Sequence, residues 1–88
     1  EQVSILCLSE KYDKYAQKVL NVLENHEIRA LIDNRSETIG KKIREAEMNK
    51  IPYMLILGEQ EENDGTISVR RHSEGDLGSM SVEAFSKL

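Results

Sequence analysis

The sequence predicts an α/β fold: one domain of 88 residues built on a mixed sheet. Two near-continuous apolar runs, residues 3–8 and 53–57, are typical of strands buried on both faces, as in parallel sheets. Residues 12–26 place apolar side chains at three- and four-residue steps, the spacing of a helix face packed on a sheet. An Asp-Gly turn signal at 64–65 precedes strict alternation over 66–70, which adds an antiparallel strand.

The first part of the chain is predicted to form a βαβ unit. Ser9 follows the first apolar run and can cap a helix, with Glu10 near the positive end of the helix dipole. The helix is expected to end at Asn25 or His26, and residues 28–32 form the second strand. Strand, helix and strand within about 30 residues give a βαβ unit, whose crossover is expected to be right-handed.

A second helix is predicted over residues 38–49, before the third strand. Ser36 or Thr38 can cap it, and Pro52 stops the helical pattern. Gly40 falls in its first turn, where glycine costs about 1 kcal/mol relative to alanine. A close approach by another backbone or by a ligand is therefore expected at Gly40.

The remaining segments complete the sheet and add a final helix. Residues 59–65 form a polar turn, so short that the strand after it runs antiparallel to the third strand. A short fifth strand is possible around residues 77–80, and Ser81 caps a last helix. Val82, Phe85 and Leu88 share one face of that helix.

Composition limits the classes of function. Apolar residues make up 39% and charged residues 32% of the chain, as in ordinary soluble domains. No apolar run approaches the roughly 20 residues of a membrane helix, no secretory leader is visible, and the single cysteine fits a reducing compartment. We therefore expect a cytoplasmic protein that does not associate with a membrane. The chain does not begin with Met, so residues 1–88 are expected to be one domain excised from a longer protein.

Charge is distributed unevenly along the chain. The net charge of −4 argues against non-specific binding to nucleic acid. However, residues 29–50 hold more basic than acidic side chains, whereas residues 59–64 hold acidic side chains only. A local positive face on an acidic protein is therefore possible.

The residues do not support catalysis or metal binding. The turn at residues 8–12, between the first strand and its helix, lacks the glycines of nucleotide-binding loops. His72, Glu74 and Asp76 alternate in a polar loop, which is common on protein surfaces and does not make a metal site. No serine or cysteine has an activating base near it in the sequence. Catalytic and metal-binding residues are accordingly expected to be absent.

One polar group of residues remains, at 35–44 together with Glu61 and Arg70. Composition alone favours a solvated charged surface, and the same residues also fit a docking surface for single-stranded nucleic acid. In the second interpretation lysines and arginines contact phosphates. Glu61 accepts from the N1–H and N2–H groups of guanine, and Arg70 donates to carbonyl oxygens of bases.

Several motifs favour the second interpretation. They are D-x-R-x-E-x-x-G-x-K-I-R-x-A at 33–46, K-I-P-Y-M at 50–54, G-T-x-S-V-R at 65–70 and G-D-x-G-x-M at 75–80. With them, the whole chain resembles the C-terminal anticodon-binding domain of bacterial threonyl-tRNA synthetases. Prolyl-, histidyl- and glycyl-tRNA synthetases carry related domains that usually lack this combination.

The resemblance implies a three-layer α/β/α fold with about three helices. Its mixed five-stranded sheet has the order 2-1-3-4-5, with strand 4 antiparallel to the others. The implied partner is the anticodon stem-loop of threonine tRNA, whose second and third anticodon bases are G and U. Matched position by position, the implied RNA-binding residues are Glu61 and Arg70 for the bases, Ser36 for an anticodon contact, and Arg35, Lys42 and Arg44 for phosphates.

Two of these matches leave alternatives open. Bacterial members of the family often have Asn at the position of Ser36. Serine has one hydroxyl where Asn has a donor and an acceptor group, so this contact is expected to be shorter or water-mediated. Arg44 fits equally well as a structural partner of Asp33 or Glu37.

The implied parent enzyme joins threonine to tRNA with ATP and uses zinc in its catalytic domain. Residues 1–88 would be its non-catalytic anticodon-binding domain, with no cofactor of their own. The further partners would be the rest of the synthetase chain and, through other regions, a second copy in a homodimer. The alternative is a protein-interaction or regulatory module of the same fold that does not recognise tRNA.

Overall fold

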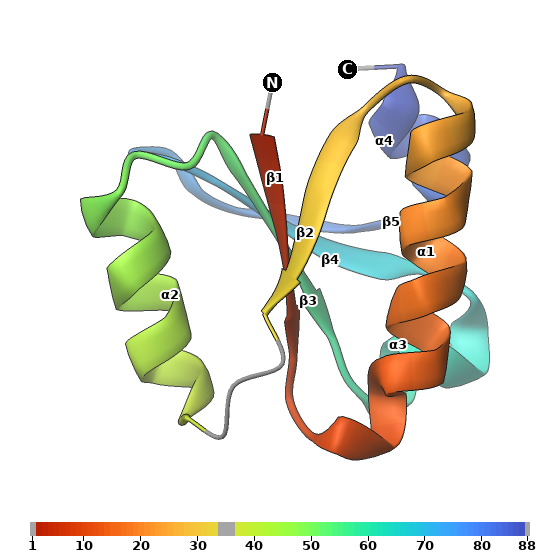
Figure 1. The fold of residues 1–88 in the computed structure, drawn as a ribbon, viewed down its shortest axis with the longest axis horizontal. Helices are drawn as coiled ribbons and strands as arrows, with labels where there is room; N and C mark the ends of the chain where they lie inside the picture. The colour runs from red at the N-terminus through yellow and green to blue at the C-terminus, as the bar shows by residue number, and fades with distance from the viewer. Residues whose placement is uncertain (1, 34–36, 88) are drawn as a thin grey trace.

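A five-stranded mixed sheet forms the centre of the molecule (Figure 1). The structure is a computed structural model that describes residues 2–33 and 37–87. The strands lie in the order β2-β1-β3-β4-β5; β1 is parallel to β2 and β3, and β4 is antiparallel to β3 and β5. The order and the single reversed strand confirm the predicted fold class. Strand bounds are β1 (Gln2–Cys7), β2 (Arg29–Asp33), β3 (Tyr53–Leu57), β4 (Ile67–Arg71) and β5 (Gly75–Met80).

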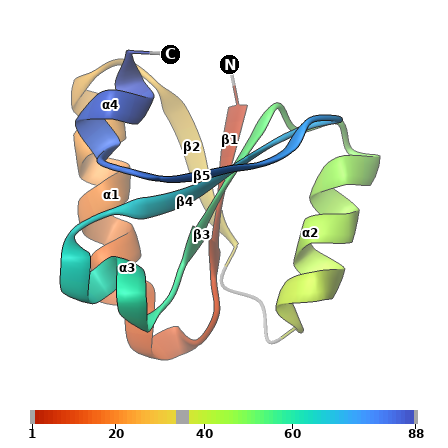
Figure 2. The same ribbon diagram turned by 180° about the vertical axis from the view of Figure 1, so that it is seen from behind.

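Helices lie on both sides of this sheet and give the predicted three layers. One side carries α1, α3 and α4, and α2 lies on the other side (Figures 1 and 2). We call the side covered by α2 the α2 face. The bounds are α1 (Asp13–Asn25), preceded by the short 3-10 helix η1 (Glu10–Tyr12), α2 (Ile39–Met48), α3 (Glu59–Asp64) and α4 (Val82–Ser86).

Each side of the sheet has its own hydrophobic core. The buried residues of the larger core come from β1, β3, β4, α1 and α4 and include Ile5, Leu23 and Leu55; partly buried side chains of β2 and β5 pack against it. The smaller core, on the α2 face, is formed by Leu6, Ala46 and Met54 together with partly buried isoleucines. Strands β1 and β3 are thus buried on both faces, as their apolar runs predicted. Buried residues of the smaller core come from β1, β3 and α2, so this core does not extend over β4 and β5.

Side-chain oxygens cap η1, α2 and α4, whereas Tyr12 at the start of α1 makes no side-chain cap. Ser9 accepts a hydrogen bond from the N–H of Lys11 at 3.3 Å, at the start of η1. Thr38 caps α2 and accepts from the N–H of Lys41 at 3.2 Å. Ser81 caps α4 in the same way. Each cap satisfies an N–H group that the helix itself leaves without a partner.

The connection between β3 and β4 differs from the prediction. Residues 59–65, predicted as a polar turn, contain helix α3. Gly58 precedes α3 and the side chain of Glu61 reaches back to its N–H; Gly65, with φ of 70°, ends the helix in the left-handed conformation. The two strands are nevertheless antiparallel, as predicted. Residues 2–33 and 37–87 therefore contain four α-helices, one more than the three expected.

Three smaller expectations concern single positions. Strand β5 begins at Gly75, ahead of the predicted residue 77. Apart from the two chain neighbours of Gly40 and the backbone of its own helix, no described atom lies within 4 Å of where a Cβ on Gly40 would stand, so the expected close approach is not found among the described residues. Val82 and Phe85 are buried on one face of α4, as predicted, and Leu88 lies outside the described residues. Within residues 2–33 and 37–87, no helix is long and apolar enough to cross a membrane.

Candidate nucleic-acid interface

The three parallel strands end at the same level, and Lys42 lies at this end. Cys7 is paired with Leu57, and Leu6 with Asp33, so β1, β2 and β3 finish side by side. Lys42 of α2 is only 4% exposed, and its Nζ donates to the carbonyl oxygens of Cys7 at 3.4 Å and Asp33 at 3.2 Å. Lys42 thus ties the start of α2 to the ends of two strands. Its contact with a phosphate stays a prediction, and it would require the ammonium to leave these carbonyls.

Glu61 lies at the same end of the sheet, in the first turn of α3. Both carboxylate oxygens are hydrogen-bonded within the chain. Oε1 accepts from the backbone N–H of Gly58 at 2.8 Å, and Oε2 accepts from the hydroxyl of Ser68 at 2.7 Å. The side chain is half-buried. A carboxylate can accept about four hydrogen bonds, so each oxygen can still take a second donor.

Arg70 lies on β4, two residues beyond Ser68. Ser68 is opposite Ile56 and Arg70 is opposite Met54, both of which pack in the smaller core. Residues opposite each other in an antiparallel pair share a face, so Ser68 and Arg70 both lie on the α2 face. Two residues along a strand span about 7 Å. Ser68 also donates to Glu61. The Glu61 carboxylate and the Arg70 guanidinium therefore belong to one surface, next to the smaller core on the α2 face.

The guanidinium of Arg70 is incompletely satisfied within the chain. Its Nε is buried and has no hydrogen-bond partner among the described residues. The ladder to β5 is irregular here, with a shift in register between Val69 and Arg70. The extra residue is Leu77 on β5, so the ladder beside Arg70 is interrupted from the β5 side. A buried donor without a partner is costly, which makes Arg70 a candidate to receive an additional acceptor.

The remaining predicted contacts lie on or before α2. Arg44 is exposed on this helix. Arg35 and Ser36 lie outside the described residues. Glu37, one of the two structural partners considered for Arg44, forms an ion pair with Lys41 at 3.3 Å. The structure therefore brings Glu61 and Arg70 together, leaves Arg44 accessible, and places Lys42 inside.

Comparison with known sequences decides the family. Residues 2–88 match the sequence profile of the family described as the anticodon binding domain. The chain belongs to this family.

Individual relatives agree with this assignment. The chain is 66% identical to a threonine–tRNA ligase of Flavobacterium johnsoniae and 54% identical to one of Bacteroides thetaiotaomicron, over 100% of its own length. It spans 14% of the length of each of these relatives. Among solved structures, the RNA binding domain of threonyl-tRNA synthetase from Cryptosporidium parvum matches with a TM-score of 0.90 and 28% identity, over 99% of this chain and 22% of that one.

Sequence reasoning missed the groups that support Glu61 in this anticodon-binding domain. The alternation over residues 66–70 puts Ser68 on the same face as Arg70, and that pattern was the available signal. No role was predicted for Ser68. Tyr15 of α1 donates its hydroxyl to the carbonyl oxygen of Thr66 at 2.6 Å and fixes the chain just before β4. Burial, followed by the charges of Glu61 and Glu62, raises the pKa of the Tyr15 phenol, which keeps it a hydrogen-bond donor.

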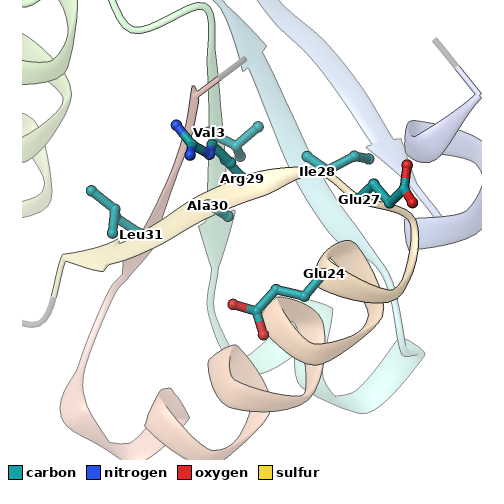
Figure 3. Close-up of a pocket in the computed structure, with 7 residues that line it drawn as sticks. All are labelled: Val3, Glu24, Glu27, Ile28, Arg29, Ala30 and Leu31. Atoms are coloured by element: carbon teal, nitrogen blue, oxygen red, sulfur yellow. The ribbon is translucent and has the colours of Figure 1, made fainter.

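A cavity lies elsewhere on the domain. It has a volume of about 540 Å³ and is open along the edge strand β2. Figure 3 shows Glu24 and Glu27 beside the strand that carries Arg29 and Leu31. Two carboxylates at its rim do not suit a phosphate. This cavity is at the opposite end of the strand order from β4 and does not coincide with the Glu61–Arg70 surface.

Two other chemistries, a reactive thiol and a metal site, were searched for among the residues that the structure describes. Burial, followed by the charge of Asp13, raises the pKa of the Cys7 thiol to about 11. The thiol is therefore protonated at neutral pH and a poor nucleophile. Within residues 2–33 and 37–87, no group of three His, Cys, Asp or Glu side chains could hold a metal ion.

Proposed function

We propose that this domain binds the anticodon loop of threonine tRNA as the C-terminal module of a threonyl-tRNA synthetase. The bacterial relatives named above support the choice of threonine. The observation that carries the proposal is the pairing of Glu61 and Arg70 on one surface, with the Glu61 carboxylate fixed at both oxygens.

The two side chains have complementary chemistry for unpaired bases. The carboxylate of Glu61 accepts the adjacent N1–H and N2–H groups of guanine, and Arg70 donates to carbonyl oxygens of a neighbouring base. Loop bases expose these edges, whereas a duplex largely hides them. A guanine and a uracil, the bases that the resemblance implies, offer this set of donors and acceptors.

Phosphate contacts come from the helix side of the site. Arg44, exposed on α2, and Arg35, just before α2, supply the positive charge, and Ser36 supplies a hydroxyl near the anticodon. Lys42 contributes by holding α2 against the strand ends. With a net charge of −4 the domain attracts RNA weakly as a whole, so binding depends on these local contacts.

The chemistry of aminoacylation lies in other parts of the proposed enzyme. That enzyme would join threonine to tRNA with ATP and use zinc in its catalytic part. It would be a cytoplasmic homodimer assembled through regions other than this domain. In this proposal the domain contributes recognition of the tRNA.

A binding titration tests the proposal. The 88-residue chain has a core on each side of its sheet and is expected to fold by itself. It is titrated with the anticodon stem-loop of threonine tRNA and with the same RNA carrying adenine in place of the middle guanine. Glu61→Gln and Arg70→Ala are each expected to weaken binding by about 1–3 kcal/mol, roughly 5- to 160-fold. Glu24→Gln and Arg29→Ala make the same charge changes at exposed positions along the distant edge strand β2 and serve as controls.

Salt dependence separates the phosphate contacts from the base contacts. Arg44→Ala is expected to weaken binding to both RNAs equally and to reduce the slope of log K against log salt by about 1. Unchanged binding in both Glu61→Gln and Arg70→Ala would refute the assigned base contacts. Absence of guanine-dependent binding by the unmodified chain, with capture of a protein partner, would favour a protein-interaction module instead.

A further inference from the structure

The Glu61 carboxylate is held in one orientation by two elements. The N–H of Gly58 fixes Oε1 from the start of α3, and the hydroxyl of Ser68 fixes Oε2 from β4. Distances of 2.8 and 2.7 Å are those of hydrogen bonds to a charged acceptor. The terminal torsion of a glutamate is broad when nothing restrains it. With one donor on each oxygen, rotation of the carboxylate about that torsion is restricted.

This orientation matters for reading a base with two donors. The N1–H and N2–H groups of guanine are adjacent and parallel, so each must meet a different carboxylate oxygen in one plane. A freely rotating carboxylate meets one donor and misses the other for much of the time. Resting on the proposed function, we infer that Ser68 is a positioning residue: its hydroxyl sets the plane of the Glu61 carboxylate and thereby the preference for guanine at the middle anticodon position.

The surroundings of Ser68 fix its own position. The hydroxyl of Tyr15 holds the carbonyl oxygen of Thr66 at 2.6 Å, two residues before Ser68. Ile67 and Val69, on either side of Ser68, are 0% exposed in the larger core. The backbone that presents the hydroxyl is thus anchored from α1 and from the core. The single O–H group of Ser68 donates its hydrogen bond to the Glu61 carboxylate.

A replacement of guanine by inosine tests this inference. Inosine keeps N1–H but lacks the amino group at position 2. The unmodified chain is expected to prefer the guanine stem-loop by roughly ten-fold or more, within the range of one bidentate contact. In Ser68→Ala this preference is expected to fall to about two-fold, with inosine affinity little changed. Ser86→Ala is the control, because Ser86 lies on α4, on the other side of the sheet, where its hydroxyl donates to the carbonyl oxygen of Glu83.

Threonine and valine variants separate the hydroxyl from the fold. Their side chains have nearly the same shape, and both suit a strand. Ser68→Thr is expected to keep the guanine preference and Ser68→Val to lose it, while thermal unfolding confirms that both are folded. This pair decides the question even where Ser68→Ala does not fold.

The possible failures are distinguishable. Equal weakening of guanine and inosine binding in Ser68→Val would overturn the inference, because it would assign Ser68 to general affinity. An unchanged guanine preference in that variant would overturn it as well. If the unmodified chain shows no preference between the two RNAs, the proposed base contact of Glu61 fails first, before any Ser68 variant is measured.

Discussion

Replacing Lys42 with methionine would test whether this buried lysine is a structural residue. Methionine matches its length but cannot donate to the carbonyl oxygens of Cys7 and Asp33. Hydrogen bonds from a charged group contribute about 1.5–3 kcal/mol each, and those at 3.4 and 3.2 Å belong at the lower end. Relief from burying an ammonium offsets part of the loss. We expect a net destabilisation of about 2 kcal/mol.

Lys41 provides the matched control for this measurement. Its side chain is 48% exposed and pairs with Glu37 across one helical turn, an interaction that contributes at most about 1 kcal/mol. For a domain of this size each kcal/mol shifts Tm by about 4–8 °C, so Lys42→Met should lower Tm by roughly 8–16 °C and Lys41→Met by far less. Urea unfolding, monitored by circular dichroism, gives the free energies of unfolding of the two variants. Equal stability of the two variants would refute the structural role, and a reduced salt dependence of RNA binding in Lys42→Met would then favour the phosphate contact predicted from the sequence.

Three further predictions concern the frame of the domain. The pKa of the Cys7 thiol is about 11 in the folded chain, above its ordinary value of 9.0. The thiol therefore ionises first in the unfolded state, and stability is lost as pH rises from 9 towards 11. In urea unfolding, the stability difference between the unmodified chain and Cys7→Ala should accordingly shrink from pH 8 to pH 10.5. Tyr15→Phe removes the hydrogen bond to Thr66 but keeps the ring, and should cost about 1 kcal/mol in the same assay; no loss would mean that water replaces the contact. Thr38→Ala removes the cap of α2 and should cost about 1 kcal/mol, whereas Thr38→Ser should be close to neutral; equal stabilities would exclude a contribution from the cap.

The elements predicted well are those whose burial is written into the sequence. Strands β1 and β3 are apolar on both faces because helices cover both sides of them, and α1 shows its buried face at helical steps. Helix α3 was not predicted, because it has no buried residue and therefore no periodic apolar face. Its signals were local: glycines before and after it, and Glu61 at the position that can reach back to the first of them.

The site was harder to predict because charge is a poor guide to exposure. Lys42 was grouped with Arg44 as a surface base, yet it shares the spacing of the buried face of α2 with Ile39, Ile43 and Ala46. That spacing was a usable signal. The partners of its ammonium, two backbone carbonyls at the ends of separate strands, come from the tertiary fold and leave no trace in local sequence. The hydroxyl of Ser68 likewise meets Glu61 only because α3 and β4 fold against each other.

The placement of Ser68 and Arg70 on one strand also sets a length scale for whatever RNA the domain binds. Alternate residues of a strand lie about 7 Å apart, and that distance cannot be adjusted without breaking the ladder of β4. Stacked bases in a nucleic-acid strand lie about 3.4 Å apart. The anchor of Glu61 at Ser68 and the start of the Arg70 side chain are therefore about two stacking distances apart on a rigid strand. This spacing suits two bases splayed out of a loop better than two neighbours in a continuous stack.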